Sequence, residues 1–224
     1  HISVIEPFSF LQLGHLKKLH IGFNRLEQIT ENMFNGLFNL TEFDLSTNII
    51  SSIAKRAFDD LINLKKLDLS HNQLKSLSSG VFTEMKNLLH LDLSYNQLKS
   101  LSSNVFHGLY ALKVIDLEYN NLEEIDCAFL NLTQLNSIYL NSNNLRQIEK
   151  RTFAGAEEII NLDLSDNLLD KHVDRNVFDR FGASMEILIL NNINANLSEF
   201  LDFSLFKKLK SLSVTKSKFS IQTE

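Results

Sequence analysis

The chain has 224 residues, with 22 basic and 27 acidic side chains and a formal net charge of −5. This mild acidity argues against a nucleic-acid-binding protein, which normally presents a basic face. Hydrophobic residues make up 44% of the chain, too many for a disordered protein, and no apolar run has the roughly 18 residues of a membrane span. A single cysteine excludes both an internal disulfide and a zinc finger.

The pattern Leu-x-x-Leu-x-Leu-x-x-Asn recurs along almost the whole chain, with Ile, Phe or Met replacing Leu in some copies. Its final asparagines fall at a nearly constant spacing, at Asn24, Asn48, Asn72, Asn96, Asn120, Asn143 and Asn167. Two degenerate copies follow, ending at Ile193 and Ser217. A constant period of this length is the signature of a solenoid, in which each repeat forms one coil.

One phenylalanine in each repeat keeps the same period. These are nine of the 17 phenylalanines: Phe10, Phe34, Phe58, Phe82, Phe106, Phe129, Phe153, Phe178 and Phe206. Each coil thereby supplies one large apolar group on the far side of its core from the leucines. We expect these rings to form a continuous spine through the stacked coils.

The alternation x-Leu-x-Leu predicts one short parallel strand per coil, with its leucines inward and the x residues outward. Strands about 4.8 Å apart in nine coils make a sheet on the order of 40 Å long. The repeated asparagine amide both donates and accepts hydrogen bonds. We therefore expect it to satisfy backbone groups where the strand ends and to tie each coil to the next.

These residues resemble the leucine-rich repeat family over essentially the whole chain. The 24-residue unit with the convex segment x-x-x-x-Phe-x-x-Leu is similar to the animal extracellular class, which includes Toll-type receptor ectodomains and secreted insect immune proteins. The resemblance implies an α/β repeat fold: a right-handed solenoid, or horseshoe, with a parallel concave β-sheet and a convex side of loops or 3₁₀ turns. Residues 1–224 would form this single domain of about nine coils.

The resemblance also implies a function and a location. Such proteins are extracellular, either secreted or part of a receptor ectodomain, and bind a protein ligand or co-receptor through the concave face, often in innate immunity. The alternative is a structural spacer or a dimerising arm of an adhesion or receptor protein, forming a homo- or heterodimer. The class usually carries cysteine-rich caps, which this chain lacks, so we expect it to be a fragment of a longer protein.

The repeat becomes irregular after Asn167, and the segment from Asn194 to Phe206 has the length of a longer, helical convex segment. Irregular coils are typical of a cap or of a change in curvature. A binding site on the distorted edge, or a self-association surface between Lys171 and Phe206, is the alternative.

One outward strand position forms a column rich in carboxylates: His20, Asp44, Asp68, Asp92, Asp116, Tyr139, Asp163, Ile189 and Ser213. Consecutive carboxylates about 5 Å apart repel by roughly 1 kcal/mol per neighbouring pair in water. The column predicts either a site for a cation or basic ligand, or a structural repeat whose carboxylates are satisfied by nearby serines and lysines. Lys65 and Lys113 are expected to flank it.

A group of aromatic and apolar residues is predicted to lie outward at the middle of the concave face: Leu89, His90, Tyr95, Val114, Tyr119 and Tyr139. The tyrosines 95 and 119 belong to a second column with Phe23, Thr47, His71, Ser142 and Asp166. Exposed clusters of this kind mark partner sites, and tyrosine is favoured at binding hot spots. The same residues could instead pack on one another across strands.

The sequence predicts no enzyme, because it has no nucleophile elbow, no phosphate-binding glycine-rich loop and no His-Glu-x-x-His motif. We accordingly expect no cofactor, no metal site, no nucleic-acid partner and no membrane span. Three Asn-x-Ser/Thr sequons are candidate glycosylation sites: Asn39, Asn131 and Asn196. Cys127 is either a small filler of the convex segment or the site of an intermolecular disulfide.

The repeat pattern assigns Leu93 and Phe106 to the core. Replacing either by alanine should lower the free energy of unfolding by about 2–5 kcal/mol, because both the buried apolar area and the packed volume are lost. Urea denaturation followed by circular dichroism measures this change. An effect below 1 kcal/mol at both positions would contradict the assignment.

Overall fold

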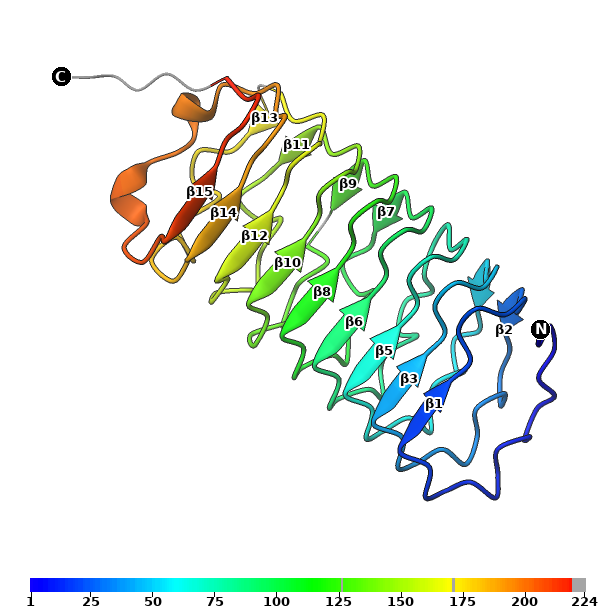
Figure 1. Ribbon diagram of the computed structural model, residues 1–224. Coiled ribbons are helices and arrows are strands. Elements are labelled where there is room, and N and C mark those ends of the chain that lie inside the picture. The colour runs from blue at the N-terminus through cyan, green and yellow to red at the C-terminus, as the bar shows by residue number, and fades with distance from the viewer. Residues whose placement is uncertain (126, 171, 219–224) are drawn as a thin grey trace.

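The computed structural model describes residues 1–125, 127–170 and 172–218. The chain forms one elongated solenoid, in which successive coils lie side by side and the first and last strands of the main sheet are at opposite ends (Figure 1). Nine parallel strands, one per coil, make the main sheet: β1 (Lys18–His20), β3 (Glu42–Asp44), β5 (Lys66–Asp68), β6 (His90–Asp92), β8 (Val114–Asp116), β10 (Ser137–Tyr139), β12 (Asn161–Asp163), β14 (Ile187–Ile189) and β15 (Ser211–Ser213). The strands follow one another in chain order, so each coil pairs only with its neighbours.

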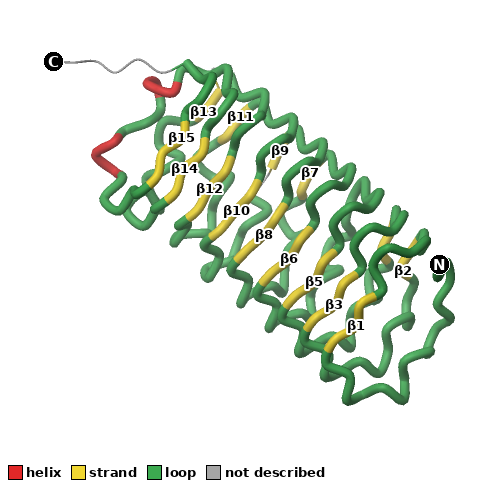
Figure 2. Tube along the Cα trace, in the orientation of Figure 1, coloured by secondary structure: helices red, strands yellow, loops and turns green. Residues whose placement is uncertain are grey.

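The other side of each coil consists of turns and of short segments with little regular structure (Figure 2). Three two-residue strand pairs lie there: β2 (Gln28–Ile29) with β4 (Ser52–Ile53), β7 (Ser100–Leu101) with β9 (Glu124–Ile125), and β11 (Gln147–Ile148) with β13 (His172–Val173). The helices of the described chain are two 3₁₀ helices, η1 (Leu197–Glu199) and η2 (Phe203–Leu205). They lie between Asn194 and Phe206, where the sequence predicted a longer helical segment.

The predicted alternation of the strands is confirmed. In β5, Leu67 is buried while Lys66 and Asp68 on either side are not, and the other strands from β3 to β14 bury their central residue in the same way. The register pairs each central residue with the next, as Leu67 pairs with Phe43 and Leu91. The core is therefore one continuous column of apolar side chains along the solenoid, with two rows of outward residues on the face of the sheet.

The phenylalanine spine forms over most of its predicted length. From Phe34 to Phe153, consecutive rings stack with centroids 5.9–6.3 Å apart. One link of the prediction is wrong, because Phe153 meets Phe181 edge-on rather than Phe178. Phe181 in turn contacts Phe178, and Phe178 contacts Phe206 as predicted. The extra residues in this irregular coil place a second ring, Phe181, between the two spine positions.

The asparagine ladder is confirmed in detail. The Oδ1 atom of Asn96 accepts the N–H of Leu74 at 3.0 Å, and its Nδ2 lies 3.0 Å from the carbonyl oxygen of Leu69. Both partners belong to the preceding coil, and Nδ2 also reaches the carbonyls of Leu93 and Ser94 in its own coil. The same arrangement recurs at Asn48, Asn72, Asn120, Asn143 and Asn167. One buried amide thus fixes two adjacent coils relative to each other.

The ladder continues beyond its last asparagine by a substitution that the sequence pattern did not reveal. Ile193 has no side-chain hydrogen-bonding group, but the hydroxyl of Ser217 accepts the N–H of Ile193 at 2.9 Å. The same hydroxyl donates to the carbonyl of Leu190 at 2.6 Å. Ser217 thus makes, at the ladder position of its own coil, the same two kinds of bond to the preceding coil that Asn96 makes to its neighbour.

A second, shorter ladder lies on the loops that lead into the strands, and the sequence analysis missed it. The Nδ2 atoms of Asn39, Asn63 and Asn87 each donate to a carbonyl oxygen of the preceding coil at 2.8–2.9 Å. Asn63 and Asn87 are exposed, whereas the asparagines of the first ladder are buried. Exposed hydrogen bonds compete with water and contribute less to stability.

The two ladders give a direct test of this difference. Asn96→Ala leaves one buried N–H and buried carbonyl groups without a side-chain partner, so the free energy of unfolding should fall by about 2–4 kcal/mol. Asn87→Ala, the matched control, should cost about 1 kcal/mol or less because water replaces its amide. Urea denaturation of both variants measures the difference. Equal losses would show that inter-coil contact, rather than burial, determines the contribution.

Candidate binding surfaces

A recurring turn at the end of each strand positions the outward side chains. In β5, the Oδ1 atom of Asp68 accepts the backbone N–H of Ser70 at 2.9 Å and its hydroxyl at 2.7 Å. Asp44, Asp92, Asp116 and Asp163 accept the backbone N–H two residues later in the same way. The structural interpretation of the acidic column is therefore confirmed for its serine partners: these carboxylates shape the turn where the strand ends.

The residue that follows this turn adopts a left-handed backbone conformation in coil after coil. The φ angles lie between 50° and 57° at Phe23, Thr47, His71, Tyr95, Tyr119, Ser142 and Asp166. Glycine or asparagine adopts this conformation at lowest cost, and a bulky side chain there is uncommon. The backbone N–H of Tyr95 donates to the backbone carbonyl of Glu118 in the next coil at 3.0 Å, as the equivalent N–H groups of the column do in their coils. The conformation therefore belongs to the coil, whereas the aromatic side chain is not required by it.

Three consecutive aromatic rings occupy this left-handed column. The rings of His71 and Tyr95 stack with centroids 4.2 Å apart, and those of Tyr95 and Tyr119 with centroids 4.4 Å apart, both at an interplanar angle of 12°. Tyr95 remains 39% exposed and Tyr119 48% exposed. Packing across coils, one of the two alternatives for these residues, is confirmed for the tyrosines, and their outer parts remain open to solvent.

These rings line a hollow of about 590 Å³ at the edge of the sheet, which we call the edge hollow. The uncharged side chains beside them belong to a single row of amides and to the asparagine ladder. The lining residues are Asn48, His71, Asn72, Gln73, Tyr95, Asn96, Gln97, Tyr119, Asn120, Asn121 and Ser142.

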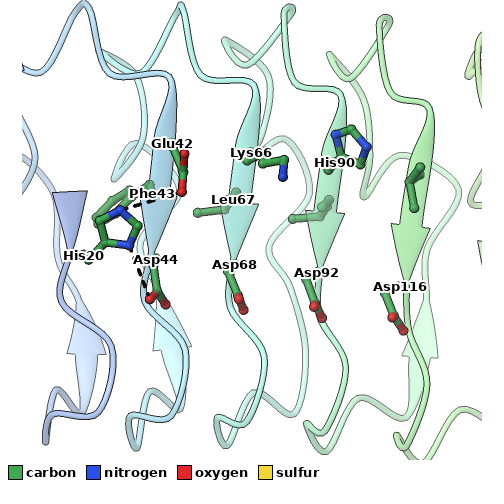
Figure 3. A pocket seen from close by; sticks show the side chains of 12 residues that line it. His20, Glu42, Phe43, Asp44, Lys66, Leu67, Asp68, His90, Asp92 and Asp116 are labelled. Atoms are coloured by element: carbon green, nitrogen blue, oxygen red, sulfur yellow. Dashed lines mark ion pairs between the residues drawn. The ribbon is translucent and has the colours of Figure 1, made fainter. Parts of the chain in front are cut away.

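A separate hollow of about 350 Å³ lies on the face of the sheet, across β1, β3, β5, β6 and β8, and we call it the sheet-face hollow. Its outward lining residues are His20, Glu42, Asp44, Lys66, Asp68, His90, Asp92, Val114 and Asp116. Figure 3 shows the four aspartates in one row, with Glu42, Lys66 and His90 in the row beside it. The predicted carboxylate column is thus confirmed, because the register pairs Asp44, Asp68, Asp92 and Asp116 in succession.

The predicted flanking cation Lys65 is not the one that lines the sheet-face hollow. Lys66 begins β5 and is the register partner of His90, so its side chain points to the sheet face. The carbonyl of Lys65 accepts the N–H groups of Leu89 and His90 in the next coil. Lys65 precedes the strand, whereas Lys66 is its first residue, and this explains the difference.

Opposite charges pair at one end of the sheet-face hollow. The Nζ of Lys18 lies 2.6 Å from a carboxylate oxygen of Glu42. The two ring nitrogens of His20, drawn in Figure 3, each lie 3.7 Å from a carboxylate oxygen, one of Glu42 and one of Asp44. The hydrogen bond from Lys18 lowers the pKa of Glu42. Burial, together with the ammonium groups of Lys66 and Lys113, lowers the pKa of His90. The imidazole of His90 is therefore largely neutral near pH 7.

Two carboxyl groups farther along the hollow have raised pKa values, so they lose their protons less readily than free aspartic acid does. Burial raises the pKa of Asp68, and the nearby carboxylates of Asp92 and Asp44 add to this effect. Burial likewise raises the pKa of Asp116 to about 7, with further contributions from Asp92 and Glu118. The sheet-face hollow therefore changes its charge close to neutral pH.

Of the six residues predicted as one patch, four divide between the two hollows, and Leu89 and Tyr139 line neither. His90 and Val114 are register partners in the sheet-face hollow, and Tyr95 and Tyr119 stack in the edge hollow. Tyr139 is half-buried on β10, in register between Asp116 and Asp163. Leu89 is half-buried just before β6. The sequence showed which side chains point outward but not the boundary between strand face and turn edge.

The three sequon asparagines differ in their surroundings. Asn39 is half-buried and donates to the carbonyl of Gly14 in the second ladder. Asn196 caps η1, where its Oδ1 accepts the N–H of Ser198. Asn131 is exposed and has a positive φ of 67°. Of the three, Asn131 presents the most accessible amide for a glycan.

Cys127 lies at the margin of the core. It is half-buried with a φ of 50°, next to the buried Ala128, so it contributes less to the core than its neighbour does. The proposed self-association segment begins at Lys171, which lies outside the described residues.

Within the described residues, the acidic and histidine side chains form no group of three suited to a metal ion. The two short helices of the described chain lack the length and apolar character of a membrane span.

Comparison with known proteins identifies the repeat. The family described as leucine rich repeat matches residues 1–48, 14–74, 38–98, 62–122, 87–145 and 125–169. None of the curated proteins matches the sequence.

Among solved structures, the TLR13–ssRNA13 complex matches with 27% identity and a TM-score of 0.88, over 95% of this chain and 31% of that one. The Toll–Spatzle complex, a molecular hub in Drosophila development and innate immunity, matches with 23% identity and a TM-score of 0.83, over 98% of this chain and 29% of that one. A chain of the octameric complex of latrophilin 3, Unc5D and the FLRT2 leucine-rich repeats matches with 25% identity and a TM-score of 0.80, over 92% and 63%. The predicted solenoid fold is thus confirmed. The chain spans about a third of the length of the first two matched chains.

The raised pKa of Asp116 predicts a pH-dependent stability. The folded protein holds this proton more tightly than the unfolded chain, so stability is lost as pH rises from about 4 to about 7. Asp116→Asn cannot ionise and should gain about 1–2 kcal/mol over the native protein at pH 8, since solvent partly screens this half-exposed group. At pH 4 the gain should vanish.

Thermal and urea denaturation at the two pH values measure this gain. Asp163→Asn is the matched control, because it alters the same turn hydrogen bond beside the uncharged register partners Tyr139 and Ile189. A gain for Asp116→Asn that is the same at pH 4 and pH 8 would contradict the prediction.

Proposed function

The chain belongs to the leucine-rich repeat family, and on that basis we propose that it is an extracellular recognition module that binds a protein ligand through the face of its sheet. Innate immunity is the proposed setting, because the matched complexes include TLR13 and Drosophila Toll. The proposed partner is a protein ligand or co-receptor. The role requires no cofactor, metal or catalytic residue, in keeping with a family of binding modules.

The sheet-face hollow is the observation that carries this proposal. It joins the outward residues of five successive coils into one surface, with Lys66, His90 and the aspartates beside the apolar Val114. Mixed charge next to an exposed apolar group gives a protein partner both orientation and buried area. Leu89, His90, Val114 and Tyr139 form the proposed contact region, and Tyr95 and Tyr119 border it.

The charge of the face favours protein over nucleic acid. One of the matched structures is a complex with single-stranded RNA. RNA binding requires cations that neutralise phosphates, whereas this chain has a net charge of −5 and carries four consecutive aspartates on the sheet face. A phosphate backbone along this column would meet like charge. We therefore propose a protein ligand and no nucleic-acid partner.

Substitution on the sheet face tests the proposal. Val114→Arg adds a bulky charge at a half-buried outward position, so it should abolish retention of the partner without a large change in melting temperature. Ile62→Arg is the matched control, an equally drastic change at an exposed position on a loop away from the strands. Both variants and the native protein are immobilised and exposed to extracellular fluid of the source organism, and retained proteins are identified by mass spectrometry.

We expect one protein to be retained by the native chain and by Ile62→Arg but not by Val114→Arg. Equal retention by all three would move the site away from the sheet face. Retention of no protein, with self-association detected by analytical ultracentrifugation, would favour the spacer or dimerising-arm alternative.

A further inference from the structure

We propose that the edge hollow is a second ligand site, which binds a neutral oligosaccharide. The site lies beside the sheet-face hollow and is lined by different residues, so it goes beyond the proposed protein-binding role. Its evidence is the composition of the lining, the confinement of that composition to a few coils, and the fixed geometry of the ring stack.

The lining of the edge hollow contains aromatic, amide and hydroxyl groups, and none of its described residues is acidic or is a lysine or arginine. Charged residues make up 22% of the chain, and the sheet-face hollow is rich in them. A hollow of about 590 Å³ with this lining offers hydrogen bonds without net charge. Such chemistry suits a neutral polar ligand.

The aromatic and amide side chains are concentrated in the middle coils. Two rows run along the edge: the left-handed column, with His71, Tyr95, Tyr119 and Ser142, and a row of amides two residues later, with Gln73, Gln97, Asn121 and Asn144. In the flanking coils the same rows carry Arg25, Thr47, Ile49, Asp166 and Leu168. The repeat therefore requires neither an aromatic ring nor an amide at these positions, and the run of both in the middle coils is a property of the site.

The ring stack restricts which part of each aromatic side chain meets a ligand. Tyr95 lies between His71 and Tyr119 at 4.2 and 4.4 Å, so both of its faces are covered. Its exposed part is therefore at the edge of the ring. The stack therefore presents a row of ring edges, close to the row of exposed or half-buried amides at Gln73 and Gln97. Rings held in this way are preorganised for binding and lose little entropy.

This arrangement discriminates among ligand classes. Nucleic acids and anionic lipids require cations, which the described lining lacks. A protein hot spot usually inserts an aromatic ring into a pocket of the partner, and the covered faces of Tyr95 prevent this. A sugar offers many hydroxyl groups that pair with amides and phenols, and its C–H groups can pack on the exposed parts of the His71 and Tyr119 rings.

The same chemistry could be presented by a free polysaccharide or by a glycan attached to the protein ligand. Two neutral probes, chitohexaose and cellohexaose, test the shared chemistry, and a heparin-derived hexasaccharide is the anionic comparison. Isothermal titration calorimetry measures binding. Tyrosine fluorescence adds a local readout, because the chain has four tyrosines and no tryptophan.

The decisive variant is Tyr95→Phe/Tyr119→Phe combined with Gln97→Leu, which keeps the stack and removes hydrogen-bonding groups. Tyr110→Phe is the matched control, since Tyr110 is similarly exposed but packs edge-on against His107 outside the hollow. We expect a neutral probe to bind the native protein and the control, with an affinity at least about tenfold lower for the triple variant. The melting temperature should be unchanged.

Three outcomes would overturn the proposal: no binding of either neutral probe at about 1 mM, unaltered binding to the triple variant, or preferential binding of the heparin fragment. The protein-binding proposal is tested independently of this one. The Val114→Arg variant should still bind the oligosaccharide but should no longer retain the protein ligand. If the glycan is carried by the protein ligand, enzymatic deglycosylation of that ligand should weaken its retention by the native chain but not by the triple variant. Unchanged retention by the native chain identifies a free oligosaccharide as the source.

Discussion

The fold depends on how the backbone is satisfied at the turn after each strand. At the end of each three-residue strand, backbone carbonyl and N–H groups face the interior of the solenoid. No water reaches them there, so they need hydrogen-bond partners within the protein. The buried amide of an asparagine such as Asn96 accepts one of these N–H groups and approaches the carbonyls of two coils at once. One buried side chain per repeat thus completes the coil-to-coil alignment that the backbone pairing of the strands begins. The sheet, the core and the surface columns follow from that alignment.

The surface chemistry arises from the same turn. Where the strand ends in aspartate, its carboxylate accepts the N–H two residues on, and the residue after this turn has the left-handed conformation. Phe23 and Ser142 adopt the same conformation after strands that end in His20 and Tyr139, so the turn belongs to the coil and the aspartate supports it. This geometry directs the Tyr95 side chain to the edge, while the strand residues His90 and Asp92 point to the sheet face. Identical backbone in every coil brings equivalent side chains close together, which explains both the stacked rings and the column of mutually repelling carboxylates.

The sequence was sufficient for the features that depend on period alone. The strands, the inward leucines, the ladder and the acidic column follow from a constant spacing, since equal spacing places equivalent residues in register. Features that depend on a change of spacing or of residue type were not predictable. Phe181 lies between Phe153 and Phe178 in the spine, and Ser217 makes the ladder bonds of its own coil in place of an asparagine. The division of the predicted patch was also inaccessible, because it depends on a positive φ at Tyr95 and Tyr119 that the repeat pattern does not encode in residue type.

The two hollows differ because the repeat constrains them differently. On the sheet face, aspartates such as Asp68 accept a hydrogen bond from the turn, so folding accounts for part of this carboxylate column. Other coils carry His20, Tyr139 or Ile189 in the same column, so the repeat favours these carboxylates without requiring them. At the edge, the coil requires a conformation rather than a side chain, and glycine or asparagine would cost least. Aromatic rings at three successive edge positions are thus unexplained by folding. Selection for binding is most readily recognised at residues that a fold tolerates but does not require. Such residues are uncharged at the edge, whereas on the sheet face they are mixed in charge.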